Sequence, residues 1–162
     1  MIHFATSYFY QIRFFKPDMI PLSTARFDPS WFHRNKGHNF TFFDKNRVLN
    51  GLRLEEFAPG PLCEGLCRGP ENCSKNINNC DFLNIYRKQL ESVSFENLIQ
   101  RCENCLTWYK VKHNIEFTDP TFVMMVYETP TNPCSERSAI QDWFKSKGID
   151  CKELSIDKSL KI

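Results

Sequence analysis

A continuous apolar run at residues 122–127, Phe-Val-Met-Met-Val-Tyr, constrains the fold more than any other segment of this chain. A strand with one face in water alternates apolar and polar residues, whereas a strand covered on both faces does not. The run therefore predicts a strand that is covered on both faces. Strand-like segments at 2–8 and 19–25 precede it, and a helical pattern at 133–147 and a short strand at 152–156 follow it. This order of strands and helices predicts an α/β fold.

Two further helices are expected before the apolar run. Residues 81–91 have a helical pattern, and Ser94 is a suitable N-cap for a longer helix at 95–112. Gly148 is placed to end the last helix, and Pro21 predicts that its strand either starts late or lies at a sheet edge. The 95–112 helix carries one apolar stripe at helical spacing, formed by Phe95, Leu98, Ile99, Cys102, Leu106 and Tyr109.

Length and composition indicate a single domain over residues 1–162. The chain is 41% hydrophobic and 25% charged, and its formal net charge is +2, so it is no polycation. No apolar run approaches the ~20 residues that cross a bilayer, and the first residues lack the pattern of a secretory signal. We therefore expect no membrane partner and a cytoplasmic location.

Four of the eight cysteines gather in a Gly/Pro-rich loop at 58–80, inserted within the domain. Cys63, Cys67, Cys73 and Cys80 are spaced C-x3-C-x5-C-x6-C. Such a loop has few apolar groups to hold it, and four thiolates would fix it around a metal. Zinc is the leading expectation, an iron–sulfur cluster is a second, and unligated thiols are a third.

Cys102 and Cys105 form a separate C-x2-C pair within the predicted 95–112 helix. Cys102 falls on the apolar stripe and Cys105 lies next to it, and cysteine is among the most buried residue types. Core packing is the favoured interpretation, and replacement of one loop ligand is the alternative.

The corner between the apolar strand and the last helix is a candidate active site. Glu128 ends the strand, and Cys134 and Arg137 open the predicted helix at positions i and i+3. A helix N-terminus favours anions and lowers the pKa of a thiol, so Cys134 is a candidate nucleophile, Arg137 an anion clamp and Glu128 a base. The alternative is structural: Cys134 caps the helix, and Arg137 pairs with Glu128 or Glu136.

Polar residues also follow the first two predicted strands. Ser7, Tyr8 and Arg26 are expected at the carboxyl ends of those strands, where ligands bind in parallel α/β sheets. If these strands neighbour 122–127, their ends converge with the corner and form a polar, phosphate-sized site. The dinucleotide fingerprint, the Walker loop and the common hydrolase motifs are all missing from the sequence.

The first third of the chain is basic and aromatic. Residues 1–53 contain eight basic and three acidic side chains, together with 12 of the 23 aromatic residues. Cations meet phosphates and rings stack on bases, so this composition suits a nucleotide or a nucleic acid. Equally, the rings can form core and the charges a solvated face.

Several of these residues resemble the family called domain of unknown function 488. The shared features are Thr6-Ser7-Tyr8, Ser23-Thr24-Ala25-Arg26, Tyr127-Glu128, Pro133-Cys134, Arg137 and Gly148. The chain has Cys134-Ser135-Glu136-Arg137 where the family has Cys-His-Arg, so the His is absent and the Arg is displaced by one position. The cysteine-rich loop is extra. The resemblance implies a small three-layer sandwich, with a mostly parallel sheet flanked by helices and the matched polar residues on one side of it. It implies no reaction.

Two functions stay open at this point. The first is binding of a phosphate-bearing ligand, a nucleotide or a nucleic acid, at the carboxyl ends of the strands, with chemistry that depends on Cys134. The second is a zinc-stabilised module that binds nucleic acid or protein without catalysis. The sequence does not decide whether the protein is an enzyme.

Overall fold

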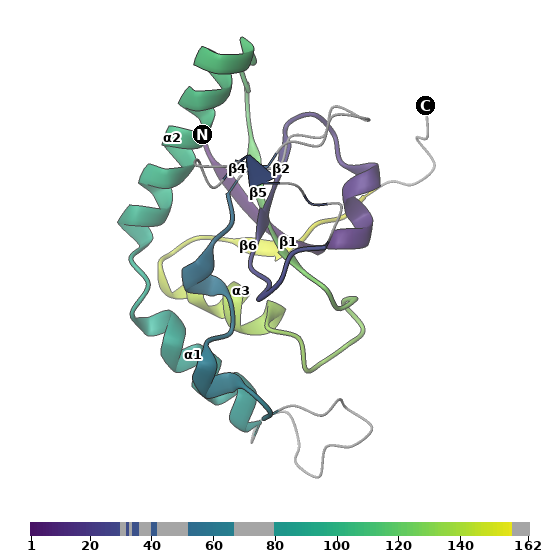
Figure 1. Ribbon diagram of the computed structural model, residues 1–162, viewed down its shortest axis with the longest axis vertical. Helices are drawn as coiled ribbons and strands as arrows, with labels where there is room; N and C mark the ends of the chain where they lie inside the picture. The colour runs from purple at the N-terminus through teal and green to yellow at the C-terminus, as the bar shows by residue number, and fades with distance from the viewer. Residues whose placement is uncertain (30–31, 33, 36–39, 42–51, 67–79, 157–162) are drawn as a thin grey trace.

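The computed structural model describes residues 1–29, 32, 34–35, 40–41, 52–66 and 80–156 (Figure 1). Its centre is a four-stranded sheet in the order β2-β5-β1-β6, in which every pairing is parallel. The strands are β1 (His3–Tyr8), β2 (Met19–Ser23), β5 (Thr121–Val126) and β6 (Cys151–Glu153). The predicted α/β class is confirmed, and the apolar run forms a strand that is covered on both faces.

The pairing register brings the carboxyl ends of three strands together. Thr121, the first residue of β5, pairs with His3 of β1 and with Met19 of β2. At the other end, Val126 of β5 pairs with Tyr8 of β1. The segments that follow β2 and β5 therefore leave the sheet next to each other.

Three α-helices of the described chain pack on one face of the sheet: α1 (Asp81–Glu91), α2 (Phe95–His113) and α3 (Arg137–Ser146). Figure 1 shows α1 and α2 along one side of the strands. From β5, Phe122, Met124 and Val126 join the helices in one buried cluster. Burial of these apolar side chains is the main stabilising contribution on this face.

The opposite face is covered differently. Val123 and Met125 of β5 pack there against Phe9 and Ile12 of η1 (Phe9–Phe14), a short 3-10 helix on the far side of the sheet from α1 and α2 (Figure 1). Phe32 packs in the same cluster. In the described residues this second cover is therefore a 3-10 segment, where a three-layer sandwich would have α-helices.

The ends of α2 and α3 follow local signals. The Ser94 hydroxyl accepts the Asn97 N–H at 3.2 Å, as expected of an N-cap, and Asn114 ends α2 in the left-handed region at φ 53°. Gly148 follows α3 with φ 75°, a conformation that suits glycine.

The prediction that the last helix begins at residue 133 is wrong, because α3 begins at Arg137. The side chain of Asn132 accepts the Cys134 N–H at 2.9 Å, and the hydroxyl of Ser135 accepts the Arg137 N–H at 3.2 Å. In a helix that began at 133 the Arg137 N–H would donate to the carbonyl of residue 133, so its bond to Ser135 competes with the helical bond. Cys134 consequently lies in a turn before the helix and not in its first turn.

Strand β2 lies at the edge of the four-stranded sheet, which is one of the two alternatives that Pro21 predicts. The segment at 52–54 runs beside its end, where Ser23 donates its N–H to Leu52 at 3.0 Å and accepts one from Leu54 at 2.8 Å. A separate two-residue ladder pairs β3 (Arg34–Asn35) with β4 (Phe40–Thr41).

The described helices include none with the length and apolar character needed to span a bilayer.

Candidate functional site

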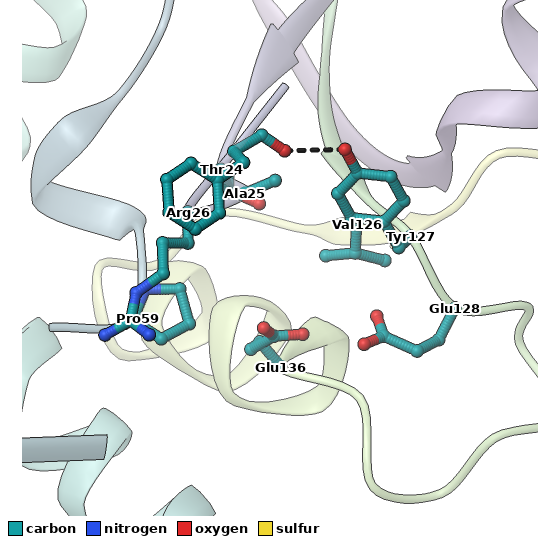
Figure 2. Close-up of a pocket in the computed structure, with 9 residues that line it drawn as sticks. Thr24, Ala25, Arg26, Pro59, Val126, Tyr127, Glu128 and Glu136 are labelled. Carbon is teal, nitrogen blue, oxygen red and sulfur yellow. Dashed lines mark hydrogen bonds between the residues drawn. The ribbon is translucent and has the colours of Figure 1, made fainter. Parts of the chain in front are cut away.

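A pocket of about 310 Å³ opens at the carboxyl ends of β2 and β5 (Figure 2). It lies at the sheet edge where ligands bind in parallel α/β proteins. The residues that line it come from the segments after both strands, from the 58–66 segment and from the start of α3: Thr24, Ala25, Arg26, Phe27, Pro59, Val126, Tyr127, Glu128 and Glu136.

One wall of the pocket, residues 24–28, is fastened to β5 and to the segment after it. The Thr24 hydroxyl donates to the Met125 carbonyl at 2.7 Å. The Tyr127 hydroxyl donates to the Phe27 carbonyl at 2.6 Å, the dashed line in Figure 2. These two bonds fix the backbone from which Arg26 projects.

A buried ion pair between Arg53 and Asp28 also holds residues 24–28 in place. Arg53 donates to the Asp28 carboxylate at 2.7 Å and also to the Arg26 carbonyl, while the Ser23 hydroxyl donates to Asp28. The side chains of Arg53 and Asp28 are only 10% and 12% exposed. A charge pair at this depth that also meets hydrogen-bond partners holds a geometry well, because breaking it leaves a buried charge.

Helix α1 positions the wall that contains Pro59. The Tyr86 hydroxyl donates to the Phe57 carbonyl at 2.6 Å. The Gln89 side chain donates to the Ala58 carbonyl at 2.7 Å and accepts the Gly60 N–H at 2.9 Å. The pocket is thus framed by backbone segments whose polar groups are satisfied by buried or half-buried side chains.

Glu128 and Glu136 form a carboxyl pair at one end of the pocket. Their carboxyl groups point toward one another in Figure 2. Burial, followed by the charge of Glu128, raises the pKa of Glu136 from 4.5 to about 7. The pair therefore exchanges a proton near neutral pH, which is the range in which a carboxyl group serves as an acid or a base.

Arg26 is the arginine among the residues that line the pocket. Its guanidinium lies 3.0 Å from the Glu64 carboxylate, and the two side chains are 36% and 67% exposed. Exposed pairs of this kind contribute about 0–1 kcal/mol, so an anionic ligand can replace Glu64 at little cost.

Cys63 lies close to the same charged groups. The thiol is buried, and burial raises its pKa, while the charges of Arg26 and Glu136 act on it in opposite directions. Burial likewise raises the pKa of Tyr86 well above its ordinary value. Both groups are therefore neutral at physiological pH beside the pocket.

Arg137 is buried at the start of α3 and binds protein acceptors. Its guanidinium donates to Glu153 at 2.6 Å, to the Thr129 carbonyl at 3.1 Å and to the Glu128 carbonyl at 2.7 Å. Glu153 also accepts the Thr6 hydroxyl at 2.8 Å. The structural alternative for the corner had Arg137 pairing with the side chain of Glu128 or Glu136. In the structure Arg137 also binds protein groups, but these are the Glu153 carboxylate and two backbone carbonyls.

Of the predicted site residues, Arg26 and Glu128 line the pocket, whereas Cys134, Arg137, Ser7 and Tyr8 are not among the lining residues. Cys134 is half-buried in the turn before α3. Its role as nucleophile stays a prediction, and so does that of Arg137 as anion clamp.

Ser7 and Tyr8 end β1, one strand further from the pocket. Ser7 is 1% exposed, and within the described part of the chain its hydroxyl finds no hydrogen-bond partner. The Tyr8 hydroxyl accepts the Gln11 side chain. Their predicted role in ligand binding stays a prediction.

The predicted metal ligands are only partly within the described residues. Cys63 and Cys80 are both buried, while Cys67 and Cys73 lie outside them. Over the described ranges, His, Cys, Asp and Glu side chains form no group of three or more that could hold a metal ion. Thiols suit zinc or an iron–sulfur cluster, but two of them do not complete a site, so a metal in the 58–80 loop stays a prediction.

The C-x2-C pair lies in the core, as favoured from its spacing. Cys102 and Cys105 are both 0% exposed, and each contributes to the cluster under the three helices. Burial raises the pKa of Cys105 to about 12 and that of Cys102 further still. Thiols of this kind are inert at neutral pH. In the described segments, the six cysteines form no disulfide.

Sequence reasoning missed Glu136, Phe27 and Pro59 as pocket residues. Glu136 stands eight residues after Glu128, and the turn between them brings the two carboxyl groups together. The signal available in the sequence was a second acidic residue directly before the last helix.

Comparison of the chain with protein-family models, with curated proteins and with solved structures found no match. The resemblance to the domain of unknown function 488 family therefore stays a prediction.

Proposed function

We propose that the protein binds a nucleotide in the pocket at the carboxyl ends of β2 and β5. The observation that carries the proposal is the composition of this pocket, which combines one arginine, two carboxyl groups and two exposed rings in about 310 Å³. That volume is at the lower end of small-molecule sites, so a mononucleotide is favoured over a nucleic-acid strand as the occupant.

The phosphate of the ligand would bind Arg26. A guanidinium presents a planar set of donors that matches phosphate oxygens. Its present partner, Glu64, is an exposed carboxylate in a weak surface pair. The wall that carries Arg26 is fixed by Tyr127, Thr24 and Arg53, which favours binding because little order is lost when the ligand enters.

The base of the ligand would meet the rings of Phe27 and Tyr127. Phe27 is 75% exposed and Tyr127 is 51% exposed, and both residues line the pocket. Stacking of a base on an aromatic ring contributes about 1–3 kcal/mol. Exposed rings beside a cation are the combination expected of a nucleotide site.

The same pocket offers acid–base chemistry through Glu128 and Glu136. The pKa of Glu136 is raised to about 7, so this carboxyl can donate or accept a proton at neutral pH. A reaction dependent on Cys134 would require the thiol to approach the ligand from outside the present lining. We therefore assign acid–base work in any reaction of the bound ligand to the carboxyl pair.

The test is equilibrium binding of the four ribonucleoside monophosphates to the wild-type chain and to Arg26→Gln. At least one nucleotide is expected to bind, and Arg26→Gln should weaken it roughly tenfold or more, because a charge-assisted contact to phosphate is lost. Arg13→Gln is the matched control, since Arg13 is exposed in η1 and is not among the lining residues. Failure of all four nucleotides to bind at millimolar concentration would reject the proposal.

A further inference from the structure

The carboxyl pair Glu128–Glu136 faces the ligand space of the pocket. Both residues belong to its lining, and Figure 2 shows the Glu136 carboxyl group between the Arg26 guanidinium and the Glu128 carboxyl group. If Arg26 binds the phosphate, the remainder of the same nucleotide lies in a pocket that this pair lines. The pair is thus placed to determine which base is accepted.

The hydrogen-bonding character of the pair follows from its geometry. The charge of Glu128 beside the buried Glu136 carboxyl favours retention of one proton by the pair near neutral pH. The remaining oxygens are acceptors, because a carboxyl group donates only through the proton it carries. One of them, Oε2 of Glu128, already accepts the Ser135 hydroxyl at 3.2 Å. The pair therefore presents acceptors to the pocket, and a matching ligand must supply donors.

The other groups near the pair leave this character unchanged. Arg137, next in the chain to Glu136, binds Glu153 and two carbonyls. The Tyr86 hydroxyl, whose pKa responds to Glu136, donates to the Phe57 carbonyl. The Cys63 thiol is buried and is at most a weak donor.

Building on the proposed function, we propose that Glu128 and Glu136 select a base whose edge carries two neighbouring N–H donors. Among the common bases, guanine has such an edge, with its ring N1–H beside its exocyclic amino group. Adenine and cytosine place a ring acceptor next to the amino group, and uracil places a carbonyl on each side of its N–H. These three bases would set an acceptor against a carboxyl oxygen, which is unfavourable.

The direct test compares GMP with IMP on the wild-type chain by isothermal titration calorimetry at pH 7. The two nucleotides differ only at the 2-position, where GMP has the amino group and IMP has a hydrogen. GMP is expected to bind roughly tenfold more tightly, since a bidentate contact to a base edge is worth about 1–3 kcal/mol of discrimination.

Variants then assign the preference to the pair. Glu128→Gln and Glu136→Gln should each reduce the ratio of the two affinities toward one, because an amide replaces one acceptor with a donor. Glu103→Gln, an exposed position on α2, should leave the ratio unchanged. Because the comparison of GMP with IMP uses the wild-type chain, equal affinities would overturn the selection even if a variant does not fold.

The outcomes separate this inference from the proposed function. Equal affinities for GMP and IMP, with binding that depends on Arg26, would overturn the selection by the carboxyl pair and keep the nucleotide site. If neither GMP nor IMP binds while another monophosphate does, the selection of guanine is overturned and the nucleotide site is kept. If none of the four ribonucleoside monophosphates binds, both proposals are overturned.

Discussion

Replacement of Glu136 by Gln tests the electrostatics of the pocket through protein stability. The pKa of Glu136 is raised from 4.5 to about 7 by burial and by Glu128, so the folded protein holds a proton there that the unfolded chain has released. The stability contributed by this proton is complete below about pH 4.5 and is lost as the pH rises through about 7. Gln has the same size and no charge at any pH.

The raised pKa sets the magnitude of the expected effect. Each pKa unit corresponds to about 1.4 kcal/mol, so the change in the free energy of unfolding has an upper limit near 3 kcal/mol. Because Glu136 is partly exposed, we expect a change of about 1–2 kcal/mol. Glu136→Gln should therefore increase the free energy of unfolding by this amount at pH 8.5 and by only about a quarter as much at pH 5, where the carboxyl of the unfolded chain has already begun to ionise.

Urea denaturation of both proteins at pH 5 and pH 8.5 measures the effect. Groups that titrate equally in both proteins cancel in the difference between them. Glu103→Gln is the control, since Glu103 is exposed on α2 and should show the same small change at both pH values. A gain for Glu136→Gln that is equal at pH 5 and pH 8.5, or a loss at both, would refute the reasoning.

Three further predictions concern the corner, the core and the loop. Arg137→Met should lower the free energy of unfolding by about 3 kcal/mol, because Glu153 and two carbonyls lose their donor, and Arg137→Lys should lower it by less. Urea denaturation measures this, and a Met variant as stable as the wild type would contradict it. Cys102 and Cys105 should resist a thiol reagent at pH 8 until the protein unfolds, as mapped by mass spectrometry, and labelling of either in the native state would contradict their burial. Elemental analysis of protein purified without chelator should find about one zinc per chain, lost in Cys63→Ser and Cys80→Ser, whereas metal-free protein would leave these cysteines as ordinary thiols.

Elements with strong local periodicity were predictable from the sequence. Helices α1 and α2 span Asp81–Glu91 and Phe95–His113, close to the ranges expected from their apolar spacing. Strand β5 falls within one residue of its apolar run. In these segments the local pattern and the tertiary packing favour the same structure.

Two elements escaped prediction for identifiable reasons. The 3-10 helix η1 carries no cap or turn signal and is stabilised by burial of Phe9 and Ile12 against β5, which is a tertiary effect. The start of α3 was misplaced because the Ser135 hydroxyl accepts the Arg137 N–H, which a helix beginning at 133 would use for its own first turn.

The sequence could predict that the site lies at the carboxyl ends of the parallel strands. Arg26 and Glu128 follow strands that are neighbours, so their convergence could be inferred from a parallel sheet. The sequence could not say that β5 would lie between β1 and β2, which takes Ser7 and Tyr8 one strand further away. The contribution of Glu136 depends on the folded turn after β5, and that turn is visible only in three dimensions.

The central claim is that the pocket between the segments after β2 and β5 is the ligand site. Titration of the ¹⁵N-labelled chain with GMP, followed by amide chemical shifts, tests it most directly. The account predicts saturable shifts at residues 24–28, at 126–128 and at Glu136, with little change at the far end of α2. Shifts confined to other surfaces, or no shifts at millimolar GMP, would contradict it.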